Sequence, residues 1–210
     1  MSVDYEINSR GAIVTGASSG MGLASAKELA QQGVNWILVS RSKEKLTQAK
    51  KEILALADVE IEVLSGNVIE KKLPLKAVEL AIAKWNKVDI LINNAGGPPM
   101  GSFLEHDDEV WDEVLEQNLK SVIRFTRAVI PMMIENKWGR IINITSTLAK
   151  EPTAAMVLSA TARAGVSAFS KSISSEVAEY GITVNTLCPG GVLTDRLHGL
   201  LSTAAENQNK

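Results

Sequence analysis

Short apolar runs alternate with longer stretches of helical spacing along almost the whole chain, and this alternation restricts the fold more than any other feature. The apolar runs cover residues 11–15, 35–40, 60–64, 88–93, 140–145 and 182–187. In most of them consecutive positions are apolar, which is typical of strands in a parallel sheet that is covered by helices on both faces. The pattern therefore predicts an α/β fold, a doubly wound parallel sheet in a Rossmann-like three-layer sandwich.

The stretches between these runs have the spacing of helices. The predicted helices cover residues 21–32, 43–57, 70–86, 108–134 and 152–179. Pro131 is expected to bend or close the fourth helix, because proline removes a helical hydrogen bond. No repeat or linker rich in Pro, Gly or Ser divides the chain, so residues 1–210 are predicted to form a single domain.

Composition argues against several classes of partner. The chain has 22 basic and 24 acidic residues and no Lys/Arg block, which argues against nucleic acid. No apolar run approaches the length of a membrane helix, so we expect no membrane association. Cys188 is the only cysteine, and the sequence has neither CxxC nor HxxxH spacing, so we expect no metal site and a reducing, cytoplasmic location.

The first apolar run leads directly into the sequence TGASSGMG, residues 15–22, and then into a helical stretch. Glycines placed between a first strand and a first helix permit the sharp turn, the approach of a diphosphate to the backbone amides, and close helix packing. The alternative is that they serve only as turn residues. Their position favours dinucleotide binding, with contacts from the whole turn: Gly16, Ser18, Ser19, Gly20, Met21 and Gly22.

The end of the second strand bears on which dinucleotide would bind. An acidic residue at this place would take the ribose hydroxyls of NAD(H). The chain instead has SRSKEKL, with Ser40 and Arg41 at the strand end. A guanidinium attracts a 2′-phosphate, so NADP(H) is favoured over NAD(H). The alternative is an ordinary solvated arginine.

Five short motifs together resemble one protein family. They are the glycine turn, NNAG at 93–96, Asn118 in LEQNLKSV, INITS at 142–146 and NTLCPGGVLT at 185–194. In this order and spacing they resemble the short-chain dehydrogenase/reductases, and most closely the 3-oxoacyl-carrier-protein reductases and a divergent branch related to them. The resemblance implies an oxidoreductase that acts on a small-molecule carbonyl, alcohol or acyl substrate.

The resemblance also implies further coenzyme contacts. Residues after the third strand would flank the adenine, residues after the fourth would line the adenosine side, and the PGG loop would border the nicotinamide. These residues are Asn67 and Val68, then Asn94, Ala95 and Gly96, and finally Pro189, Gly190 and Thr194. An aspartate is usual where Asn67 stands, although an amide can still pair there.

The catalytic positions depart from the family pattern. Asn118 and Ser146 match it, but Ser159 and Arg163 occupy the places of the usual tyrosine and lysine. A serine oxygen stops about 4 Å short of a phenolic one and is a far weaker acid, so a bridging water would be needed. Arg163 can bind the coenzyme ribose and polarise a carbonyl, but it cannot release a proton.

Alternative proton donors are His106 and His198, which the resemblance places in loops near the substrate. Two other functions also remain open: a catalytically inert nucleotide-binding relative that acts as a sensor or oligomer subunit, and an isomerase, epimerase or lyase on the same scaffold.

Family members continue beyond the PGxxxT loop, so the C-terminal end is expected to be short relative to them. The long fourth and fifth helices could pair across a two-fold axis, so we expect a homo-oligomer, a dimer or tetramer.

Overall fold

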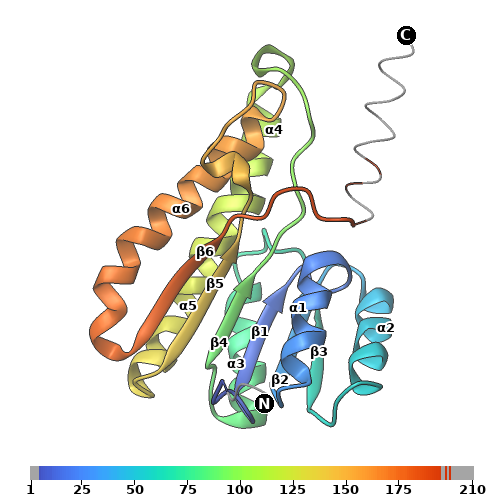
Figure 1. The fold of residues 1–210 in the computed structure, drawn as a ribbon, viewed down its shortest axis with the longest axis vertical. Helices are drawn as coiled ribbons and strands as arrows, with labels where there is room; N and C mark the ends of the chain where they lie inside the picture. Colours follow the sequence, from blue (N-terminus) through green and yellow to red (C-terminus); the bar gives the residue numbers. More distant parts are fainter. Residues whose placement is uncertain (1–4, 195–196, 198, 200–210) are drawn as a thin grey trace.

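The computed structural model of the protein describes residues 5–194, 197 and 199. Six parallel strands form one sheet in the order β3-β2-β1-β4-β5-β6 (Figure 1). Their bounds are Gly11–Thr15 (β1), Asn35–Ser40 (β2), Ile61–Ser65 (β3), Ile90–Asn93 (β4), Gly139–Ile144 (β5) and Ile182–Leu187 (β6). Strand order reverses between β1 and β4, so the predicted doubly wound sheet is confirmed, and the crevice of such a fold lies at this point.

The helices fall between the strands as the spacing predicts. Their bounds are Gly20–Ala30 (α1), Lys43–Leu54 (α2), Leu73–Trp85 (α3), Asp108–Leu115 (α4), Ser121–Glu135 (α5) and Val157–Val177 (α6). Short 3-10 turns cover Phe103–Glu105 (η1), Thr147–Ala149 (η3) and Ala178–Tyr180 (η4), and a π-turn covers Glu116–Lys120 (η2). Helix α3 begins three residues later than predicted, because Pro74 is suited to the first helical turn.

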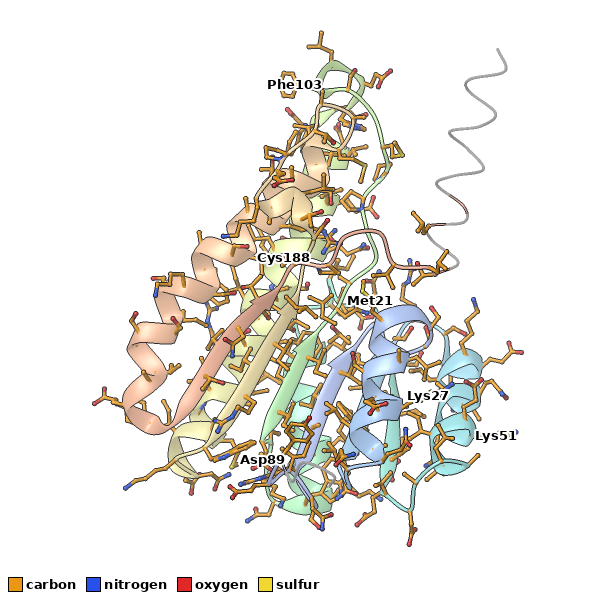
Figure 2. All side chains as sticks on the ribbon, viewed as in Figure 1. Met21, Lys27, Lys51, Asp89, Phe103 and Cys188 are labelled. Carbon is orange, nitrogen blue, oxygen red and sulfur yellow. The ribbon has the colours of Figure 1, made fainter. Side chains whose placement is uncertain are left out.

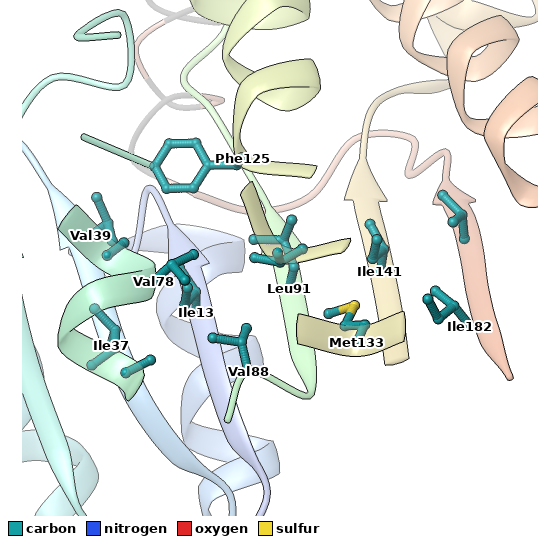
Figure 3. Close-up of a cluster of buried hydrophobic side chains, with 14 of the residues drawn as sticks. Ile13, Ile37, Val39, Val78, Val88, Leu91, Phe125, Met133, Ile141 and Ile182 are labelled. Carbon is teal, nitrogen blue, oxygen red and sulfur yellow. The ribbon is translucent and has the colours of Figure 1, made fainter. Parts of the chain in front are cut away.

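Helices α3 and α5, with the end of α6, cover one face of the sheet. Ile13 and Leu91 from the central strands pack there with Val78 of α3 and with Phe125 and Met133 of α5 (Figure 3). All five side chains are buried. This contact explains why the strand residues on this face are apolar.

Helices α1 and α2 cover the opposite face. Val14 and Leu38 of the sheet pack there with Ala26 of α1 and with Leu46 and Ile53 of α2. Both faces of β1 and β4 are therefore buried, whereas the edge strands β3 and β6 keep partly exposed positions. The continuous apolar runs of the sequence are explained by this double cover.

The predicted helix 108–134 is not one regular helix. It consists of α4, the π-turn and α5, and α5 continues past Pro131 to Glu135. Of the two expectations for Pro131, the structure therefore excludes that it closes the helix, and the helix ends one residue after the predicted position 134. Helix α6 starts at Val157 and not at residue 152, because Gly101 donates to Ala155 O and pairs with Met156, which holds the preceding residues in a loop.

A buried carboxylate joins the strands at the amino-terminal edge of the sheet, where Figure 2 labels Asp89. Asp89 is 1% exposed, and its Oδ1 lies 3.0 Å from Arg10 Nη1. Its Oδ2 accepts from the backbone of Gly11 at 2.9 Å. The Arg10 guanidinium also stacks on the Trp138 ring, 3.8 Å from its centre. This cluster lies at the amino ends of the strands, on the side of the sheet opposite the crevice.

Replacing Asp89 by alanine is expected to lower the free energy of unfolding by about 3 kcal/mol, because it leaves a buried amide and a half-buried guanidinium without their acceptor. Urea denaturation measures this loss. Asp58→Ala, a change of the same type at an exposed position, is the control. A loss at position 89 no larger than that of the control would contradict this role.

Candidate active site

A cleft of about 510 Å³ lies at the carboxyl ends of the central strands. In Figure 2, Met21 and Cys188 lie at this edge of the sheet and Asp89 lies at the other. The cleft is lined by Gly16, Ser18, Ser19, Gly20, Met21, Ala24, Ser40, Arg41, Gly66, Asn67, Val68, Asn94, Ala95, Gly96, Gln117, Val192, Leu193 and Thr194.

Hydrogen bonds from Asn94 fix the backbone of the glycine turn. Gly16 and Gly20 have φ angles of +61° and +55°, which disfavour side chains. The side-chain amide of Asn94 donates to Gly16 O at 3.2 Å. The backbone N–H of Asn94 donates to the Thr15 hydroxyl, and that hydroxyl donates to Asn94 O. A Cβ at Gly22 would lie 2.5 Å from Gly16 O. The turn therefore forms a cradle of bare backbone at the start of α1, which fits a diphosphate.

The end of β2 forms the next part of the cleft wall. The Ser18 and Ser40 hydroxyls lie 2.9 Å apart, which connects the glycine turn to β2. Arg41 follows, and its side chain has no ion-pair partner in the described part of the chain. A cation that lines the cleft without a carboxylate partner fits a phosphate group.

The candidate catalytic residues lie beside this cleft but do not line it. Ser159 is 3% exposed, and its Oγ accepts from Arg163 Nε at 3.1 Å. Arg163 Nη1 also donates to Ile144 O, at 3.3 Å, which brings α6 against the end of β5. Ser146 follows two residues later, and its Oγ accepts from the backbone of Leu148, which leaves its own proton available to donate.

Asn118 lies in the π-turn and is 5% exposed. Its amide donates to Val114 O at 3.3 Å, and the Ser121 hydroxyl donates to Gln117 O, so side chains bind carbonyls near the irregular turn. Helix α6 approaches this turn closely at Gly165, where a Cβ would lie 3.1 Å from a Leu119 methyl group. The elements that carry Asn118 and Arg163 are thus packed together.

Charged side chains fix the π-turn to α5. Glu116 Oε2 lies 2.7 Å from Arg124 Nη1, and its Oε1 lies 2.9 Å from Lys120 Nζ. Hydrogen bonds lower the pKa of Glu116 to about 2; the bond from Arg124 has the larger effect and the bond from Lys120 the next. Arg124 also donates to Ile69 O at 3.4 Å. The ion pair therefore connects the π-turn to the loop after β3.

Arg124→Met is expected to lower the free energy of unfolding at pH 7 by about 1 kcal/mol, since the pair is only partly shielded from solvent. The folded pKa of Glu116 is below its unfolded value, so this stabilisation is present above about pH 4.5 and is lost as the pH falls towards 2. Urea denaturation of both proteins from pH 7 to pH 2.5 measures the difference. A difference that stayed constant over this range would contradict the role of the ion pair.

The structure brings most of the sequence-predicted coenzyme residues to one cleft. The exceptions are Gly22, which is buried under the turn, and Pro189 and Gly190, which do not line the cleft. His106 does not line it either, and His198 lies outside the described residues.

Sequence reasoning missed several residues of the cleft wall. They are Ala24, Gly66 and Gln117. Three other residues of the wall, Ser40, Val192 and Leu193, lie in the stretches SRSKEKL and NTLCPGGVLT that the sequence had already singled out. Gly66 directly follows β3, so its position at the carboxyl edge of the sheet could have found it. Gln117 carried no signal except that Asn118 follows it.

Within residues 5–194, 197 and 199, no helix is long and apolar enough to cross a bilayer. No group of three His, Cys, Asp or Glu side chains there is placed to hold a metal ion.

Comparison with known proteins identifies the family. The short chain dehydrogenase family model matches residues 10–205. The monensin polyketide synthase putative ketoacyl reductase of Streptomyces virginiae is 38% identical over 191 residues, which are 89% of this chain and 72% of that relative. The 3-oxoacyl-[acyl-carrier-protein] reductase FabG of Escherichia coli strain K12 is 36% identical over 189 residues, 90% of this chain and 76% of that protein.

A solved structure gives the same result. An actinorhodin polyketide ketoreductase variant with NADPH is 33% identical, with a TM-score of 0.87, and the match covers 97% of this chain and 77% of the other. The fold and its cleft define a nucleotide-binding α/β protein. The chain belongs to the short-chain dehydrogenase/reductases and is an oxidoreductase.

Proposed function

We propose that this protein is an NADP(H)-dependent oxidoreductase that acts on the carbonyl or alcohol group of a small molecule, with a 3-oxoacyl group as the first candidate. One observation carries the proposal: Asn94 holds the glycine turn open at the carboxyl edge, beside Arg41. The ketoacyl reductases among its relatives support the choice of substrate.

The coenzyme contacts in this proposal follow the wall of the cleft. The amides at the start of α1 bind the diphosphate, and Arg41 with Ser18 and Ser40 binds a 2′-phosphate. Asn67 and Val68 flank the adenine. Thr194 borders the nicotinamide. Pro189 and Gly190 precede it in the same loop but do not line the cleft.

The second part of the proposal concerns catalysis. A bound reduced nicotinamide supplies the hydride. Ser146 donates a hydrogen bond to the substrate oxygen, and Arg163 stabilises the negative charge that develops on it. Ser159 positions the Arg163 side chain through its bond to Nε, and Asn118 holds the π-turn. Since Arg163 keeps its proton, a water molecule delivers the proton to the product alkoxide.

The coenzyme assignment predicts a preference that one substitution reverses. The protein is expected to bind NADPH at least about tenfold more tightly than NADH, and Arg41→Asp is expected to invert this order, because a carboxylate repels the 2′-phosphate and can accept from ribose hydroxyls. Fluorescence titration of the reduced nicotinamide measures both affinities. Lys45→Asp, a change of the same charge on α2, is the control. Equal affinities in the unchanged protein would contradict the role of Arg41.

The catalytic assignment predicts NADPH oxidation with ketones or 3-oxoacyl thioesters. Arg163→Met is expected to lower kcat/KM about 100-fold, the usual effect of removing an oxyanion donor, with coenzyme affinity changed much less. Ser159→Tyr combined with Arg163→Lys is expected to raise kcat, because it supplies a proton donor. Tight NADPH binding without turnover of any such substrate would instead favour an inert nucleotide-binding relative.

The proposal also includes a homo-oligomer and a cytoplasmic location. A groove of about 470 Å³ between α5 and α6 is lined by half-buried apolar side chains, including Ile130 and Ile173, with Arg127 and Glu176 at its rim. An apolar face with charges of both signs can pair with its own copy across a two-fold axis.

Ile130→Glu is expected to convert the oligomer to a monomer, because the substitution places a charge in this groove. Sedimentation equilibrium measures the mass of both proteins. Lys171→Glu, at an exposed position of α6, is the control. An unchanged protein that is already monomeric at high concentration would contradict the proposed pairing.

A further inference from the structure

Gln117 is part of the cleft wall, although no motif identified it. Its Nε2 donates to Gly96 O at 3.2 Å. Its Oε1 has no hydrogen-bond partner within the described part of the chain. One end of the amide is thus fixed to the loop after β4, and a hydrogen-bond acceptor remains available at the wall of the cleft.

Asn67, in the loop after β3, has the complementary arrangement. Its Oδ1 accepts from the backbone of Ile69 at 3.4 Å, and its backbone N–H donates to Glu70 Oε1 at 2.6 Å. The Nδ2 group has no partner among the residues that the structure describes. The oxygen of this second amide is therefore bonded within its own loop, and its Nδ2 group remains available to donate hydrogen bonds at the wall of the cleft.

The two amides belong to the same end of the cleft. Arg124 is bonded to Glu116, the neighbour of Gln117, and also to Ile69 O in the loop that contains Asn67. This contact brings the π-turn against the loop. The same cleft is lined by residues of the loop after β3, the loop after β4 and the π-turn: Gly66, Asn67, Val68, Gly96 and Gln117.

We propose that Gln117 determines specificity for the base of the coenzyme: its Oε1 accepts from the exocyclic amino group of adenine, while Asn67 Nδ2 donates to a ring nitrogen. The inference depends on the proposed coenzyme function. Adenine presents an amino donor beside ring acceptors, and this pattern matches an available acceptor and an available donor. Hypoxanthine has a carbonyl oxygen in place of the amino group, so it would place one acceptor against another.

The test compares the affinity for NADPH with that for reduced nicotinamide hypoxanthine dinucleotide phosphate, by fluorescence titration. The unchanged protein is expected to prefer the adenine coenzyme, and Gln117→Leu is expected to reduce that preference about tenfold, the effect of one lost hydrogen bond. Gln117→Glu keeps an acceptor but loses the donor to Gly96. This variant should bind both coenzymes more weakly and retain the preference.

Gln48→Leu, the same substitution at an exposed position of α2, is the control and should change neither affinity. If Gln117→Leu weakens both coenzymes equally, Gln117 only supports the wall and the inference fails. It also fails if the unchanged protein binds the two bases equally. Failure of the unchanged protein to bind any nicotinamide coenzyme would refute the proposed function itself.

Discussion

The bonding between Thr15, Asn94 and Gly16 is the constraint on which the site depends. Thr15 ends β1 and Asn94 follows β4, so their paired hydrogen bonds join the two strands where the sheet order reverses. The Asn94 amide then binds Gly16 O, and a Cβ at Gly22 would come within 2.7 Å of that amide. The shape of the glycine turn thus follows from the central strands, which are rigid because both faces are buried.

Much of the fold could be predicted from the sequence, because periodicity and glycine position are local signals. The runs 11–15, 35–40 and 182–187 coincide with β1, β2 and β6. The π-turn at Asn118 and the late start of α6 could not be predicted, since both depend on contacts with distant segments, such as the pairing of Gly101 with Met156. Gln117 was missed for the same reason: its contact with Gly96 joins residues 21 positions apart.

A serine with a neighbouring arginine, as at Ser159 and Arg163, differs chemically from a phenol with a neighbouring lysine. The serine hydroxyl is buried and accepts from the guanidinium, so it orients a cation and is poorly placed to donate to a substrate. The arginine reaches the end of β5 near Ser146. Under the proposed mechanism, Ser146 and Arg163 bind and polarise the substrate, while solvent delivers the proton.

The central claim is that the backbone at the start of α1 binds the coenzyme diphosphate. Amide hydrogen exchange with and without NADPH tests it most directly, because the amides of residues 18–22 would become hydrogen-bonded. We predict that NADPH slows exchange in this segment more than in the helices that lie away from the cleft. Unchanged exchange at residues 18–22 under saturating NADPH, or protection confined to another part of the chain, would contradict the account.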